Sequence, residues 1–239
     1  MKTNSNSRII VALDLPTGKA ALDLAATLVP EFNFFKVGSS LFCAEGFPII
    51  QSLQRMGASI FLDLKLHDIP EQVRKTASII GAFGVDMISV HCLGGDAMLR
   101  AAKEGVTEGA KRANAKPPRV VGVTVLTSLD ESDLLALGVK EGVESEVSTL
   151  AGLAQAAGLD GVVASPREIE LIKRQAGNDF IIVTPGIRPG SADTADQKRV
   201  LSPSQAIDAG ATYLVVGRPI TAAANPRSAA LKIAREAGV

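Results

Sequence analysis

Short runs of apolar and β-branched residues recur along the chain, and amphipathic stretches separate most of them. The runs predict strands at residues 8–14, 34–38, 59–65, 87–92, 119–126, 161–165, 180–186 and 213–219. Apolar residues recur at helical spacing in the stretches between them, as in KAALDLAATLV and EQVRKTASIIGAF. These strand–helix units, in a chain of 239 residues, favour an α/β fold, a single (β/α)8 TIM barrel that forms one domain over residues 1–239.

An open, doubly wound parallel sheet is the main alternative to the barrel. The first predicted strand leads into ALDLPTGKA, which lacks the GxGxxG turn typical of that fold. Two regions exceed simple connections. Residues 128–150 predict extra helix after the fifth strand, and residues 187–203 predict a long polar loop, which is usually functional or disordered.

Composition limits the possible partners. The 25 basic residues balance the 25 acidic ones, so the chain shows no general attraction for nucleic acid or an anionic membrane. No apolar run reaches transmembrane length, and the run near the N-terminus is too short for a signal peptide. Cys43 and Cys92 lack metal-site or disulfide spacing, and we expect both to be buried. We therefore expect a soluble cytoplasmic protein without a metal site.

Charged residues occur where three predicted strands end. Alternation along residues 59–65 places Asp63 and Lys65 on one face, which points into the barrel, while the leucines face the helices. The first strand ends in Asp14 and the second in Lys36, and Asp68 follows the third strand. A structural ion network explains any one of these residues alone. Burying several charges together is costly, so the whole set favours a functional site.

The opposite side of the rim predicts an anion site. The seventh strand leads into TPGIRPG and the eighth into VVGRPI, and phosphate commonly binds after strands 7 and 8 of such barrels. Gly186 and Gly217 allow close backbone approach, and Arg188 and Arg218 supply charged donors. Glycine turns with solvated arginines are the alternative for either motif alone.

The segment FLDLKLHDIP resembles the signature of the orotidine 5′-monophosphate decarboxylase family, in which an Asp-x-Lys-x-x-Asp-Ile run closes the third barrel strand. The resemblance extends over nearly the whole chain, through ALDLP, FKVGSSLF, VTVLTSLDESDL, VTPGIRPG and VVGRPI. It implies a carboxy-lyase that forms uridine 5′-monophosphate from orotidine 5′-monophosphate in de novo pyrimidine biosynthesis, without a cofactor.

The resemblance also implies roles for individual residues. Lys65 donates a proton to pyrimidine C6 within a catalytic array of Lys36, Asp63, Lys65 and Asp68. The implied substrate-binding set adds Asp14 at the ribose, Thr127 at the pyrimidine amide edge, Ile69 beside Asp68, and Arg188, Gln197, Gly217 and Arg218 at the phosphate, with residues 187–203 closing over it. Family members are homodimers in which Asp68 reaches the partner's site. Gln72 replaces a threonine that contacts the partner's ribose in many members, which puts that contact in doubt.

Two other functions compete with this interpretation. Sugar-phosphate enzymes of the 3-keto-L-gulonate 6-phosphate decarboxylase type share a similar core but use Mg²⁺ held by acidic residues. Lys36 puts a cation where such a metal site prefers a carboxylate. A non-catalytic nucleotide-binding barrel is the second alternative, and it predicts that Lys65 can be replaced without consequence.

Overall fold

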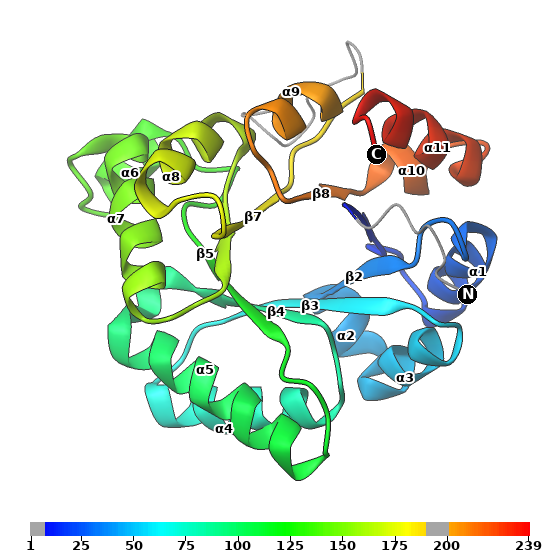
Figure 1. The fold of residues 1–239 in the computed structure, drawn as a ribbon, viewed down its shortest axis with the longest axis horizontal. Coiled ribbons are helices and arrows are strands. Elements are labelled where there is room, and N and C mark those ends of the chain that lie inside the picture. Colours follow the sequence, from blue (N-terminus) through cyan, green and yellow to red (C-terminus); the bar gives the residue numbers. More distant parts are fainter. Residues whose placement is uncertain (1–7, 190–200) are drawn as a thin grey trace.

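A computed structural model describes residues 8–189 and 201–239, in which parallel strands close into a barrel in chain order, β1 to β8 (Figure 1). The strands are β1 (Ile9–Ala12), β2 (Phe34–Gly38), β3 (Ser59–Leu66), β4 (Met87–His91), β5 (Arg119–Val123), β6 (Gly161–Val163), β7 (Ile181–Thr184) and β8 (Tyr213–Val216). β1 pairs in parallel with both β2 and β8, which closes the ring. The predicted TIM barrel is therefore confirmed, and the open sheet is excluded.

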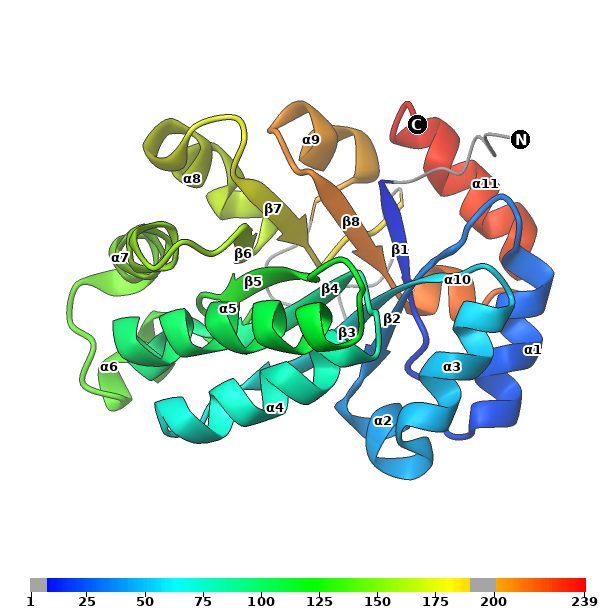
Figure 2. The ribbon, with the colours of Figure 1, turned by 60° about the horizontal axis from the view of Figure 1, so that its bottom comes forward.

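Helices surround the barrel on its outside (Figures 1 and 2). They are α1 (Gly18–Leu28), α2 (Ser39–Glu45), α3 (Phe47–Arg55), α4 (Pro70–Ala82), α5 (Gly95–Arg112), α6 (Glu131–Ala136), α7 (Gly142–Ala156), α8 (Ile169–Ala176), α9 (Pro203–Asp208), α10 (Arg218–Thr221) and α11 (Pro226–Glu236), with 3₁₀ turns η1 (Cys92–Gly94) and η2 (Pro166–Glu168). The extra helix predicted within residues 128–150 is α6, and α7 begins in the same region. Within the described ranges, none of these helices has both the length and the apolar character needed to cross a membrane.

Side chains alternate between the two sides of the barrel wall. An inner cluster fills the barrel and consists of Ile10, Ala12, Phe34, Phe61, Met87, Val121, Val183 and Val215. Their strand neighbours, such as Val11 and Leu62, belong to the larger outer cluster between the strands and the helices. This arrangement confirms the predicted inward direction of the face that carries Phe61 and Asp63.

Helices α4 and α5 pack with their backbones in close contact and lie side by side in both views (Figures 1 and 2). A Cβ atom added at Gly109 would lie 1.9 Å from the carbonyl oxygen of Ser78, and one added at Gly105 would lie 2.3 Å from that of Arg74. Only glycine permits this approach. The contact fixes α4, which begins at Pro70 directly after the end of the β3 loop.

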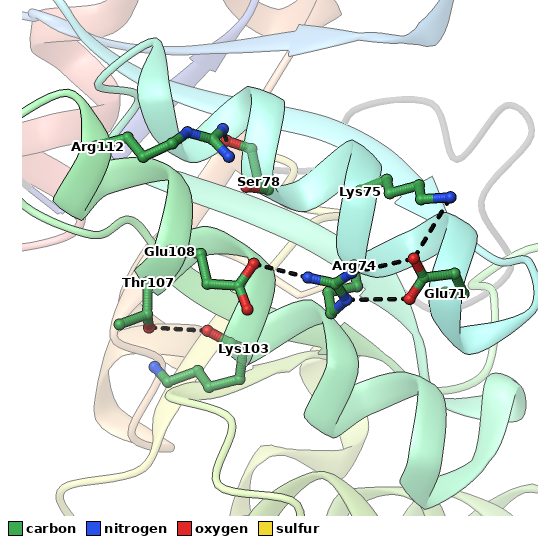
Figure 3. A network of polar contacts seen from close by, with 8 residues as sticks. All are labelled: Glu71, Arg74, Lys75, Ser78, Lys103, Thr107, Glu108 and Arg112. Atoms are coloured by element: carbon green, nitrogen blue, oxygen red, sulfur yellow. Dashed lines mark hydrogen bonds and ion pairs between the residues drawn. The ribbon is translucent and has the colours of Figure 1, made fainter.

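Polar contacts reinforce the α4–α5 pair at its exposed edge (Figure 3). The Arg74 guanidinium on α4 donates to Glu71 one turn earlier at 3.0 Å and to Glu108 on α5 at 2.8 Å. Exposed ion pairs of this kind contribute little to stability, because solvent screens them. They add less to the rigidity of the pair than the glycine contacts beneath them.

The two cysteines differ in burial. Cys92 is buried at the end of β4, as predicted, and burial raises the pKa of its thiol to about 12. Cys43 is exposed, so the prediction was wrong for this residue. Its helix, α2, buries only Leu41 completely, which leaves the other positions of that short helix at the surface.

Candidate active site

The end of β3 departs from regular strand geometry. Its pairing with β4 shifts register between Leu62 and Leu66, and Lys65 adopts a φ of 51°. Residues other than glycine rarely adopt this left-handed conformation, which costs about 1–3 kcal/mol and clusters at functional sites. The strained residue is the lysine for which the sequence predicts a catalytic role.

Four charged side chains of alternating sign meet above the barrel interior. The Lys36 ammonium donates to Asp14 Oδ1 at 2.8 Å and lies 3.7 Å from Asp63 Oδ2. The Lys65 ammonium donates to the same Asp63 oxygen at 2.9 Å. The rims of β1, β2 and β3 therefore bring Asp14, Lys36, Asp63 and Lys65 together, as their positions at the strand ends predicted.

The two central residues of this chain of charges, Lys36 and Asp63, are buried, so each interacts strongly with its charged neighbours. Lys36 and Asp63 are each 8% exposed, while the Lys65 side chain is 38% exposed and faces the opening. Burial alone would raise the pKa of Asp63. The charges of Lys65 and Lys36, with hydrogen bonds from Lys65 and Ser89, outweigh burial and lower the pKa instead. Asp63 is therefore ionised at neutral pH and attracts both ammonium groups.

Ser89 belongs to this site although the sequence analysis missed it. Its hydroxyl, fully buried on β4, donates to Asp63 Oδ1 at 2.7 Å and accepts the backbone N–H of Lys65 at 2.9 Å. The available signal was a single hydroxyl in the apolar strand MISVH. The contacts themselves depend on the shifted register of β3, which the sequence pattern does not reveal.

The loop after β3 places its predicted residues at the surface. Asp68 is exposed, and its carboxylate accepts the backbone N–H of Ile69 at 2.6 Å. Among the described residues of this single chain, Asp68 forms no ion pair with Lys36 or Lys65. Ile69 is 64% exposed, and Gln72 is exposed on the first turn of α4. The single chain thus assembles the predicted array without Asp68.

A cavity of about 180 Å³ opens beside the charges. Lys36, Asp63 and Lys65 line one part of it. Phe61, Val123, Val125, Leu126, Val163, Ala164, Pro185 and Val215 supply apolar walls, and Thr127 adds a hydroxyl. An apolar cavity with a few convergent polar groups is typical of a small-molecule site.

A second cavity, of about 440 Å³, adjoins the first and shares Lys36, Pro185 and Val215 with it. Its lining includes the predicted anion-binding residues Gly186, Arg188, Gly217 and Arg218. Gly186 has a φ of 79°, which explains a glycine there, whereas Gly217 has a negative φ and an added Cβ would make only an ordinary contact with Ala12, at 3.7 Å. The structure therefore brings the predicted anion residues beside the charged array.

The predicted loop over this cavity is described only at its two ends. The backbone N–H of Arg188 donates to the Leu201 carbonyl at 3.1 Å, and Ile187 bridges to Leu201. Gln197 lies outside the described residues. Arg188 is buried, whereas Arg218 is exposed.

Two histidines stack at the same rim, with ring centroids 5.4 Å apart. His67 is exposed, while His91 is half-buried and accepts the Leu93 N–H through Nδ1. Burial, together with His67 and Lys65, lowers the pKa of His91. No group of three or more His, Cys, Asp or Glu within residues 8–189 and 201–239 is placed to hold a metal ion.

Comparisons with known proteins agree over almost the whole barrel. The profile of the family described as orotidine 5′-phosphate decarboxylase / HUMPS matches residues 7–233. The orotidine 5′-phosphate decarboxylase of Moorella thermoacetica is 47% identical over 237 residues, covering 99% of this chain and 94% of that protein. The enzyme of the same name from Carboxydothermus hydrogenoformans is 48% identical, covering 97% and 96%. The crystal structure of orotidine 5′-phosphate decarboxylase from Lactobacillus acidophilus aligns with a TM-score of 0.85 at 36% identity, covering 97% of this chain and 99% of that chain.

Proposed function

The chain belongs to the orotidine 5′-phosphate decarboxylase / HUMPS family, and on this premise we propose that it converts orotidine 5′-monophosphate to uridine 5′-monophosphate in de novo pyrimidine biosynthesis. One observation carries the proposal. The ammonium of Lys65 is held 2.9 Å from the Asp63 carboxylate, at the wall of a largely apolar cavity that adjoins an arginine-lined one. A pyrimidine ring and a phosphate of one nucleotide fit these two neighbouring environments.

The proposed chemistry needs a proton at C6. When CO₂ leaves, the electron pair of the broken C–C bond stays on C6, and no adjacent carbonyl delocalises it. A cation fixed beforehand where this charge develops stabilises the transition state. Lys65 supplies that cation, and its N–H then forms the new C6–H bond. The neutral amine regains a proton from solvent, to which its side chain is 38% exposed.

Asp63 holds the Lys65 ammonium in the required position. Opposite charges 2.9 Å apart attract by about 6 kcal/mol at an effective dielectric near 20, and partial exposure of Lys65 reduces this value. The attraction and the hydrogen bond between the two groups fix where the ammonium lies. Lys36 forms ion pairs with both Asp14 and Asp63, and thereby links Asp63 to Asp14, the proposed ribose contact. The mechanism therefore calls on side chains alone, without a metal or other cofactor.

Arg188 and Arg218 are the proposed phosphate ligands. Both line the second cavity together with Gly186 and Gly217, and a guanidinium can bind phosphate oxygens with two parallel hydrogen bonds. Binding energy from this distant group can be used to orient the ring against Lys65. Thr127 lines the ring cavity and is proposed to contact the pyrimidine amide edge. We also assign Gln197 to the phosphate end, as the family resemblance implies.

We further propose a homodimer in which Asp68 completes the partner's site. Ile69 and Leu93, 64% and 55% exposed, follow the neighbouring strands β3 and β4, which leaves two large apolar side chains at the surface after these strands. A symmetric interface would cover these side chains and carry Asp68, Ile69 and Gln72 toward the partner's substrate. A single domain over residues 1–239 and a cytoplasmic location remain predictions from the sequence.

The test is loss of orotidine 5′-monophosphate, followed by ultraviolet absorbance in EDTA. We expect rapid loss with the wild type, almost none with Lys65→Ala, and wild-type loss with Lys19→Ala, a control at an exposed lysine of α1. Equal loss with Lys65→Ala would overturn the mechanism. No loss with folded wild type, followed by Mg²⁺-dependent turnover of a sugar phosphate, would assign the chain to the other enzymes that share this core. Binding without turnover of either substrate would favour a nucleotide-binding barrel.

A further inference from the structure

We propose that Ser89 is a positioning residue for the decarboxylation, and that it holds Lys65 and Asp63 in one fixed arrangement through its hydroxyl. The inference rests on the proposed function, because it concerns how the proton donor of that reaction is placed. Ser89 does not line either cavity of the site. It therefore acts through its two neighbours.

One hydroxyl closes a ring of interactions around the proton donor. Ser89 Oγ accepts the Lys65 backbone N–H at 2.9 Å and donates to Asp63 Oδ1 at 2.7 Å. The other oxygen of Asp63 accepts the Lys65 ammonium at 2.9 Å. The Lys65 ammonium thus contacts the Asp63 carboxylate directly, and the Lys65 backbone is linked to the same carboxylate through Ser89.

The shifted register of β3 creates the need for this hydroxyl. Leu62 pairs with Ile88 and Leu66 pairs with Val90, so three residues of β3 lie opposite Ser89 alone. The Lys65 N–H, turned by its φ of 51°, donates to a side chain instead of a strand carbonyl. Without a partner, this partly buried N–H would destabilise the strand end, and the Ser89 hydroxyl supplies that partner.

Removing the Ser89 hydroxyl should therefore change the position of the Lys65 ammonium and have little effect on substrate affinity. Asp63 would lose one of the hydrogen bonds that favour its ionised form, and the Lys65 backbone would lose the partner that supports its strained conformation. A misplacement of about 1 Å costs on the order of 100-fold in rate. The proposed phosphate ligands, Arg188 and Arg218, lie on the far side of the site and would be unaffected.

Ser89→Ala is the test, with Ser78→Ala as its matched control. Ser78 is also buried, on α4, and its hydroxyl has no hydrogen-bond partner among the described residues. For Ser89→Ala we expect kcat to fall by about 10- to 100-fold with KM within about threefold of wild type. The acid limb of the kcat–pH profile should move to higher pH, because the Asp63 carboxylate would protonate more easily. Ser78→Ala should keep the wild-type kcat and profile.

Two further variants cover the case in which Ser89→Ala does not fold. Ser89→Thr retains the hydroxyl, and Ser89→Cys replaces it with a thiol that forms weaker hydrogen bonds. We expect kcat to decrease from wild type to Thr to Cys. Equal kcat and an unmoved acid limb for Cys, or for a folded Ala variant, would overturn the proposal, as would a change in KM alone. Activity of the wild type is measured first, so a failure of the proposed function is recognised before any variant is compared.

Discussion

Replacing Gly109 by alanine should destabilise the protein, although alanine is the better helix former. Gly109 lies in α5, where it faces the backbone of α4. The new Cβ would lie 1.9 Å from the Ser78 carbonyl oxygen, whereas ordinary contact begins at 3.4 Å. The atom in the way belongs to the backbone of α4, so no change of side-chain rotamer can relieve the clash. The two helices would therefore have to separate by about 1.5 Å.

The size of the effect follows from two opposing contributions. Overpacking of a tight interior costs typically 1–3 kcal/mol, and a backbone obstacle places Gly109→Ala at about 3 kcal/mol. Alanine returns about 1 kcal/mol through helix propensity, which leaves a net loss of about 2 kcal/mol. For a domain of this size, that loss lowers Tm by about 4–8 °C.

Thermal and urea unfolding followed by circular dichroism would measure this loss. Gly152→Ala is the matched control, because Gly152 also lies inside a helix, α7, and its added Cβ would meet only the end of the flexible Gln175 side chain, at 2.8 Å. We expect its Tm within about 2 °C of wild type, since the propensity gain offsets the cost of moving Gln175. If Gly109→Ala matched this control or melted higher, the close α4–α5 contact would be refuted.

Three other predictions concern the site. The pKa of Asp63 is lower in the folded than in the unfolded protein, where it is about 4. Ionised Asp63 therefore stabilises the fold fully at a pH above the unfolded-state pKa, and this stabilisation is lost as the pH falls through the folded-state pKa. The difference in urea unfolding free energy between wild type and Asp63→Asn should therefore be constant from about pH 5 to 7 and shrink below about pH 4; a difference that grows on acidification would contradict this. Lys65→Gly should be about 1 kcal/mol more stable than Lys65→Ala in urea unfolding, because glycine adopts the φ of 51° without strain; a more stable alanine variant would argue against that backbone conformation. Arg188→Ala should raise KM for orotidine 5′-monophosphate at least tenfold and leave turnover of the nucleoside orotidine unchanged; equal losses with both substrates would show that Arg188 does not bind the phosphate.

The architecture could be predicted because each of its causes is local in sequence. Alternating apolar residues mark strands, and helical spacing marks the segments between them. Parallel strands that close in chain order bring their C-terminal ends to one rim. For that reason Asp14, Lys36 and Asp63, which lie far apart in sequence, could be expected to meet, and the structure places them within one chain of ion pairs.

The remaining features depend on geometry that periodicity does not encode. The contacts of Ser89 with Lys65 and Asp63 occur where the register between β3 and β4 shifts, and an apolar strand pattern does not reveal such a shift. Lys65, with its φ of 51°, lies within the same shifted segment. Asp68 is a different case, because its proposed role requires a second chain. The exposure of Cys43 reflects how little of α2 is buried, which composition does not reveal.

Strain and stabilisation are concentrated in the same few atoms of this site. The left-handed conformation of Lys65 costs about 1–3 kcal/mol, and a regular strand end would avoid it. Hydrogen bonds to charged groups contribute about 1.5–3 kcal/mol each, and Asp63 accepts two of them, from Ser89 and from the Lys65 ammonium. The carboxylate that attracts the Lys65 ammonium therefore also compensates for the backbone conformation of that lysine. A substitution at Asp63 should consequently remove a charge from the site and also disturb the position of Lys65, so the two effects cannot be separated by changing Asp63 alone. Ser89→Ala leaves both charged groups in the site, so at a pH above the acid limb its effect on kcat reports their arrangement.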